Sequence, residues 1–142
     1  MASVKFNYAD RKLSLTDKNK LKNFIISLFE QENTELDELN YIFCSDDYLL
    51  QINKDHLNHD YYTDIITFSL AEEGNPVIGE IYISLDRVKD NSATHKTSVL
   101  EENLRVIFHG SLHLCGYLDK KKGDIKLMRE KEDYYINQYL SL

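Results

Sequence analysis

Two histidines lie four residues apart in the stretch FHGSLHLCGYLDKKKGD, which covers residues 108–124. His109 and His113 fall on one face of a continuous helix, where both imidazoles can reach the same ion. Gly116 can adopt the left-handed conformation that ends a helix and turns the chain back, and Asp119 follows this turn. The spacing predicts two nitrogen ligands, one oxygen ligand and an open fourth position, which is the arrangement of a catalytic zinc ion.

A site without metal is compatible with the same spacing. His109 and His113 would then be half-buried polar residues, and Asp119 would be a turn residue with a solvated carboxylate. Gly110 argues against a zinc peptidase, because such enzymes have at this position the glutamate that serves as general base. A peptidase would therefore need a glutamate from elsewhere in the chain to face the metal.

The histidines require a long helix near the C-terminus. We predict this helix over residues 99–115, because Ser98 and Glu101 form a capping box at its start and Gly116 follows its end. A further amphipathic helix is predicted over residues 124–140 from the spacing of its apolar residues. The metal site is thus expected at the end of a central helix.

The preceding residues predict alternating strands and helices. Strands are expected over residues 4–8, 41–44, 64–70 and 77–85, and the last two are joined by AEEGNP as a β-hairpin. Helices are expected over residues 17–33 with Thr16 as N-cap, over 46–57 with Ser45 as N-cap, and over 85–93. The order βαβαββααα predicts an α+β fold, with a small mixed four-stranded sheet packed with about five helices.

The composition is that of one folded domain covering residues 1–142, because 42% of the residues are hydrophobic and only one is proline. The first residues contain no apolar signal segment, and no later run approaches the length of a membrane span. We therefore expect a cytoplasmic protein without a membrane partner. Cys44 and Cys115 are too few for a disulfide framework and are expected to be reduced, structural thiols.

The charge distribution is polarised. A net charge of −7 argues against a protein that coats nucleic acid nonspecifically, because the phosphate backbone favours cationic surfaces. Basic residues nevertheless cluster directly after the metal motif, at Lys120, Lys121, Lys122, Lys126, Arg129 and Lys131. The three consecutive lysines are candidates for contacts with an RNA backbone, and a plain solvated turn is the alternative.

The segment HGSLHLCGY resembles the signature H-G-x-L-H-L-x-G-Y-D-H of the YbeY family of bacterial rRNA maturation factors. Upstream blocks match in the same order: IN at 52–53, YTDIITFSL at 62–70 against P-T-D-V-L-S-F-P, and GEIYIS at 79–84 against G-D-I-x-I-S. The resemblance implies a metal-dependent, single-strand-specific endoribonuclease that matures the 3′ end of small-subunit rRNA and serves ribosome quality control. Ribosomal RNA and the small ribosomal subunit are the implied partners.

Two positions depart from the family pattern. The family's third ligand is histidine, whereas this chain has Asp119, which is also an acceptable zinc ligand. The family places an arginine shortly before its T-D block and credits it with activity; the corresponding residue is Leu57. His59 or the lysine run could supply the missing cation.

The resemblance also implies which residues surround the metal. Zinc held by His109, His113 and Asp119 would acidify a bound water and polarise a phosphodiester oxygen, with the general base unknown. Thr63 and Asp64 are expected beside the cleft, where Asp64 has a structural role or fixes the tautomer of a ligand histidine.

Other nearby rings have two interpretations each. Three tyrosines are candidates for stacking on RNA bases or for core packing, and three histidines without a partner at ligand spacing are expected to be solvated or core residues. The tyrosines are Tyr61, Tyr62 and Tyr117, and the histidines are His56, His59 and His95. A different class of function also stays open: a ribosome-associated assembly factor with a structural metal, which cuts no RNA.

Overall fold

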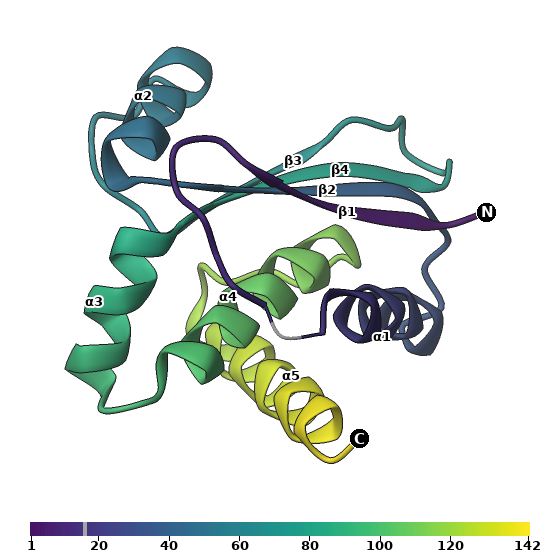
Figure 1. Cartoon of the computed structure of the whole chain (residues 1–142). Coiled ribbons are helices and arrows are strands. Elements are labelled where there is room, and N and C mark those ends of the chain that lie inside the picture. Colours follow the sequence, from purple (N-terminus) through teal and green to yellow (C-terminus); the bar gives the residue numbers. More distant parts are fainter. Residues whose placement is uncertain (16) are drawn as a thin grey trace.

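The computed structural model describes residues 1–15 and 17–142. Its elements follow one another as β1 (Ser3–Tyr8), α1 (Lys18–Gln31), β2 (Leu36–Cys44), α2 (Asp46–Leu57), β3 (Ile65–Ser69), β4 (Val77–Ser84), α3 (Leu85–His95), α4 (Val99–Leu114) and α5 (Lys122–Leu140). This order confirms the predicted α+β fold with its four strands and five helices (Figure 1). None of the helices in the described residues is both long enough and apolar enough to cross a membrane.

The strands form one mixed sheet in the order β1-β2-β4-β3. β2 lies parallel to both β1 and β4, and β3 runs antiparallel to β4, which confirms the predicted hairpin. Ile65 pairs with Ile83 and Ser69 pairs with Gly79 in this hairpin. The hairpin therefore places β3 at an edge of the sheet.

The two faces of the sheet are covered differently. Helices α1, α4 and α5 lie on one face, with α4 against the sheet, while α2 lies on the other side (Figure 1). Tyr41 is fully buried between the sheet and α4, and its hydroxyl donates to the carbonyl of Ile107 at 2.9 Å and lies 2.6 Å from the hydroxyl of Ser111. The middle of α4 is thus tied to the centre of the sheet.

The close approach of α4 to the hairpin depends on Gly110. A Cβ atom at this position would lie 2.8 Å from the side chain of Ile81 and 3.1 Å from that of Ile65. Any larger residue would push the helix away from β3 and β4, because buried side chains are already in contact. Gly110 therefore sets the position of the helix that carries both motif histidines.

The start of β2 lies five residues from its predicted position, whereas the other predicted boundaries lie within two residues of the observed ones. Thr16 lies outside the described residues, and α1 is capped by Asp17, whose carboxylate accepts the N–H of Lys20 at 3.1 Å. β2 begins at Leu36 rather than at Tyr41. The first half of β2 contains polar residues that do not predict a strand. It is a strand in the structure because it pairs with β1 on one side and β4 on the other.

Both cysteines are free thiols, as expected. Burial raises the pKa of Cys44 to about 12, and burial likewise raises the pKa of Cys115 to about 12. Because the thiolate is the reactive form, both side chains stay in their unreactive thiol form at neutral pH.

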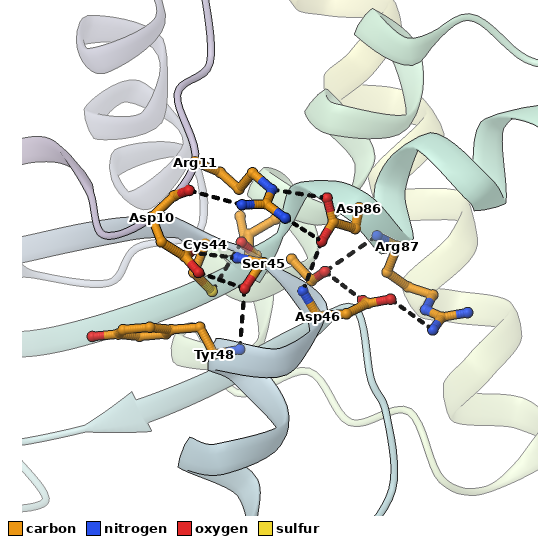
Figure 2. Close-up of polar contacts among 10 residues, drawn as sticks. Asp10, Arg11, Cys44, Ser45, Asp46, Tyr48, Asp86 and Arg87 are labelled. Carbon is orange, nitrogen blue, oxygen red and sulfur yellow. Dashed lines mark hydrogen bonds and ion pairs between the residues drawn. The ribbon is translucent and has the colours of Figure 1, made fainter.

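A polar cluster joins three segments at one end of the sheet. We call it the junction cluster; its residues are Asp10, Arg11, Ser45, Asp46, Ser84, Asp86 and Arg87, and Figure 2 labels all of them except Ser84. Ser45 and Ser84 are the N-caps of α2 and α3, and each accepts a backbone N–H from the first turn of its helix. The carboxylates of Asp10 and Asp46 in turn accept these two serine hydroxyls, each at 2.6 Å. The cluster thereby ties the starts of two helices to the loop after β1.

Candidate metal centre

The three predicted ligand residues lie together at the end of α4. The Nε2 atoms of His109 and His113 lie 3.2 and 3.1 Å from the same carboxylate oxygen of Asp119. Their ligand atoms are all within 4.8 Å of one another. Two imidazole nitrogens and one carboxylate oxygen match the donor set of a zinc site with an open position.

The second nitrogen of His109 is held by a residue of α5. Its Nδ1 donates to Glu132 at 2.6 Å, and the other oxygen of this carboxylate accepts from Arg105 at 2.9 Å. Glu132 is only 4% exposed, so its charge is shielded from water. A carboxylate behind a ligand histidine fixes the ring tautomer, which leaves Nε2 as the atom that can bind a metal.

His113 is held by the turn that follows the helix. Its Nδ1 donates to the backbone carbonyl of Tyr117 at 2.9 Å. Gly116 makes this possible with a φ of 105°, a conformation that side-chain-bearing residues rarely adopt. Both ligand histidines thus have Nδ1 occupied and Nε2 directed at Asp119.

Glu32 holds this turn through Tyr117. The hydroxyl of Tyr117 donates to Glu32 at 2.6 Å, and the same carboxylate accepts from Tyr135 and from Lys131. Burial tends to raise the pKa of Glu32, but these donors prevail and lower it. Glu32 therefore remains a carboxylate that fastens the turn to α1 and α5.

The three ligand atoms of His109, His113 and Asp119 need a positive charge between them. With Nδ1 protonated, a neutral imidazole presents a lone pair at Nε2, and two such lone pairs would face a carboxylate oxygen at hydrogen-bonding distance. Burial lowers the pKa of His109, yet the hydrogen bond and charge of Glu132 and the charge of Asp119 raise it overall. A proton on His109 or a metal ion bound by the three ligand atoms can supply this charge.

The ligand residues open into a cleft of about 880 Å³. Its walls are formed on one side by the end of α2, the following loop and β3, and on the other by α3, α4 and α5. Thr63 and Asp64 line the first wall, as the family resemblance implied. Burial raises the pKa of the Asp64 carboxyl, and the nearby His109 opposes this change.

Of the two roles considered for Asp64, the orientation of the His109 ring is carried out by a different residue. Within the part of the chain that the structure describes, the hydrogen bond to His109 Nδ1 comes from Glu132 and not from Asp64. Glu132 lies on α5 with Met128 and Ile136, four residues to either side, and all three are buried. A charged residue on the apolar face of a helix needs a partner, and this signal could have identified Glu132.

The predicted RNA-contacting residues are separated by the structure. Lys120 lines the cleft, whereas Lys121 and Lys122 are exposed at the start of α5 and are not part of the lining. Among the tyrosines, only Tyr61 lines the cleft. Tyr62 lies under the guanidinium of Arg87, outside the lining.

The position of the family's arginine is occupied by an apolar side chain on the cleft wall. Leu57 is 39% exposed and lines the cleft. The cleft also contains Arg105 and Arg129, of which Arg129 belongs to the basic cluster that follows the metal motif in the sequence. Arg105 is bound to Glu132 and Asp133, whereas the exposed Arg129 lies 3.9 Å from Glu132. Arg129 is thus the arginine that remains accessible in this cleft.

The structure offers no room for the glutamate of a zinc peptidase. A side chain at Gly110 would collide with Ile81. The two glutamates that line the cleft are engaged elsewhere: Glu132 binds His109 and Arg105, and Glu102 accepts from Thr97 at 3.1 Å. Neither carboxylate among these described residues is free to act as the general base of a peptidase.

Comparisons with known proteins agree with this geometry. The sequence profile described as "Endoribonuclease YbeY" matches residues 4–140. The chain is 45% identical over 131 residues to a Cytophaga hutchinsonii protein named endoribonuclease YbeY, with 92% of each chain covered. It is 42% identical over 136 residues to the Flavobacterium johnsoniae protein of the same name, with 96% of each covered.

A solved structure has the same fold. The solution structure of TM1509 from Thermotoga maritima superimposes with a TM-score of 0.64 and 28% sequence identity, and covers 96% of this chain and 89% of the other. The profile match extends over nearly the whole chain, and the motif histidines lie within it. The chain belongs to the YbeY family of endoribonucleases.

Proposed function

We propose that this protein is a metal-dependent endoribonuclease that cuts single-stranded RNA during the maturation of small-subunit rRNA. The observation that carries the proposal is the convergence of two oriented imidazoles and a carboxylate in an open cleft. Relatives named endoribonuclease YbeY support the same activity. The proposed partners are the small ribosomal subunit and its RNA. We further propose that the protein serves ribosome quality control and that it acts in the cytoplasm.

The proposed metal is zinc, held by His109, His113 and Asp119. This donor set suits zinc, although nickel and other divalent metals accept the same ligands. When bound, the metal supplies a Lewis acid that activates water and stabilises charge on a phosphate group.

The chain's own residues prepare the site for this chemistry. Glu132 and the carbonyl of Tyr117 keep both histidines in the tautomer that binds metal. Lys120 and Arg129, both exposed in the cleft, are the side chains proposed to bind the phosphates of the substrate. Gly110 keeps the helix close to the sheet, so that the ligands stay on a rigid element.

The test is cleavage of a single-stranded RNA that spans the 3′ end of small-subunit rRNA. We expect cleavage by the purified protein, its loss on chelation, and its recovery on adding zinc. His113→Ala should abolish cleavage, whereas His56→Ala should retain it, because His56 is exposed and is not among the cleft residues. Chelator-resistant cleavage that His113→Ala does not change would overturn the proposal.

A second candidate is a non-cleaving assembly factor with a structural metal. The observation that favours it is Leu57, which places an apolar side chain where the family has an arginine credited with activity. This candidate predicts intact RNA in the same assay, together with retained binding to small ribosomal subunits. Leu57→Arg should then restore cleavage if the missing arginine is the cause.

A further inference from the structure

Two aromatic rings form a pair on the cleft wall that follows α2. The rings of His59 and Tyr61 are stacked, with centroids 5.1 Å apart and an angle of 22° between their planes. The hydroxyl of Tyr61 lies 2.9 Å from Nδ1 of His59. Tyr61 is 55% exposed, and both rings line the cleft that contains the metal ligands. Two aromatic side chains are therefore presented within the proposed active site.

The ring pair is held in place from the interior. Asn53 is only 2% exposed, and its side-chain amide donates to the backbone carbonyl of Tyr61 at 2.9 Å. The backbone carbonyl of Asn53 accepts the backbone N–H of His59 at 3.1 Å. Asn58 ends α2 in the left-handed conformation, which turns the chain toward the cleft. Because the loop is tied to a buried side chain, a ligand that contacts the rings loses little conformational entropy in ordering them.

The two walls of the cleft differ in chemistry. The wall between α2 and β3 presents Leu57, His59 and Tyr61, and its described lining residues include no lysine or arginine. The opposite wall presents the accessible cations Lys120 and Arg129. One wall therefore suits the flat faces of nucleobases, and the other suits phosphates.

We propose that His59 and Tyr61 form a base-stacking subsite for single-stranded RNA, next to the metal centre. The inference rests on the proposed function and names the part of the substrate that this wall contacts. Every base has a flat face, so stacking tolerates many sequences. A base within a duplex is already stacked on both sides, so the subsite selects unpaired nucleotides.

The subsite is tested by binding, without cleavage. A fluorescently labelled single-stranded 2′-O-methyl oligonucleotide is titrated with zinc-loaded protein, and the anisotropy is measured. Tyr61→Leu should weaken binding about 5- to 150-fold, the range of one base–aromatic contact. Tyr61→Phe keeps the ring and should bind within about twofold of the parent protein. Tyr62→Leu is the matched control and should bind normally, because Tyr62 lies outside the cleft lining.

A second titration removes the bases instead of the ring. Oligonucleotides with abasic nucleotides keep the phosphates but cannot stack. The parent protein should lose affinity for them, whereas Tyr61→Leu should bind the abasic and the complete oligonucleotides alike. An equal loss in both proteins would mean that the base contacts something other than Tyr61, and it would overturn the subsite.

Failure of the subsite and failure of the nuclease have different signatures. Metal content and thermal unfolding of Tyr61→Leu should be close to those of the parent protein, because Tyr61 is exposed and its hydrogen bonds among the described residues are with Asn53 and His59. If Tyr61→Leu binds RNA normally while the parent protein cleaves RNA, the subsite is wrong and the nuclease stands. If Tyr61→Leu loses binding but no protein cleaves, the subsite stands and the nuclease is rejected.

Discussion

The metal centre and the junction cluster are both built from charged side chains at helix ends, but they use their polar atoms differently. In the junction cluster the acids are satisfied within the protein: Asp46 accepts from Ser84 and Arg87, and Asp86 accepts from Arg11 and the N–H of Asp46 (Figure 2). In the metal centre, two ring nitrogens and a carboxylate oxygen face one another. Donors that meet acceptors stabilise a fold, whereas acceptors that meet acceptors call for a cation.

This difference shows that a dense network of charges is not by itself a binding site. The junction cluster joins three segments of the chain, yet among the described residues it holds no group of three side chains that could bind a metal ion. The metal centre has fewer internal bonds, and its supporting bonds all leave the Nε2 atoms free. Substitutions in the two regions should therefore change different quantities.

The largest effect is expected for His113→Ala. Removal of one of three ligands should lower zinc affinity by more than about 100-fold, beyond the loss typical of supporting residues. The affinity is measured by competition with a chromogenic chelator. Asp46→Ala in the junction cluster is the control and should leave zinc affinity unchanged. Retained affinity in His113→Ala would remove the distinction between the two regions.

Glu132→Gln should have the next largest effect, an about 10- to 100-fold loss of zinc affinity. The amide keeps the size of the side chain but weakens its hold on the Nδ1 proton of His109, so the ring is less well oriented. Glu130→Gln, on the exposed face of the same helix, is the matched control. If both variants bind zinc alike, Glu132 serves only the packing of α5.

Asp46→Ala should lower the free energy of unfolding by about 1–2 kcal/mol, because it leaves partly buried donors on Ser84 and Arg87 without their acceptor. Urea denaturation measures the change. Asp55→Ala, on the exposed side of the same helix, should change stability by less than about 0.5 kcal/mol. A zinc-affinity loss in Asp46→Ala would contradict a purely structural junction cluster.

Tyr117→Phe should weaken zinc binding about fivefold, because it removes the hydrogen bond from the Tyr117 hydroxyl to Glu32, which contributes about 1 kcal/mol. This bond holds the turn whose carbonyl, at Tyr117, orients His113. The matched control is Tyr134→Phe on the exposed face of α5. Calorimetric zinc titration of both proteins measures the difference. Equal affinities would show that the turn is held without Glu32.

The smallest effect is a pH dependence in the junction cluster. The backbone N–H of Asp46 and the guanidinium of Arg11 lower the pKa of Asp86, against the opposing effect of burial. A lowered pKa means that the stabilisation is complete above the unfolded-state pKa of about 3.9 and is lost as the pH falls through the folded-state value. Asp86→Asn should therefore lose less stability than the parent protein on acidification below about pH 4, as followed by circular dichroism.

The sequence predicted the order of the elements because hydrophobic periodicity and capping residues are local signals. Ser45 and Ser98 cap their helices as predicted, and Gly116 adopts the expected positive φ. The start of β2 was predicted incorrectly because hydrogen bonds to two neighbouring strands extend it through polar residues. Such pairing depends on segments distant in the chain.

The site divides in the same way. His109, His113 and Asp119 could be selected from the sequence, because helix geometry and a glycine turn bring residues ten positions apart to one place. Glu132 could not be assigned, because its contact with His109 exists only after α5 packs on α4. The sequence by itself determined the candidate ligands and the family signature. Only the tertiary structure decided which carboxylate orients His109 and which tyrosine faces the cleft, because both depend on packing between distant helices and strands.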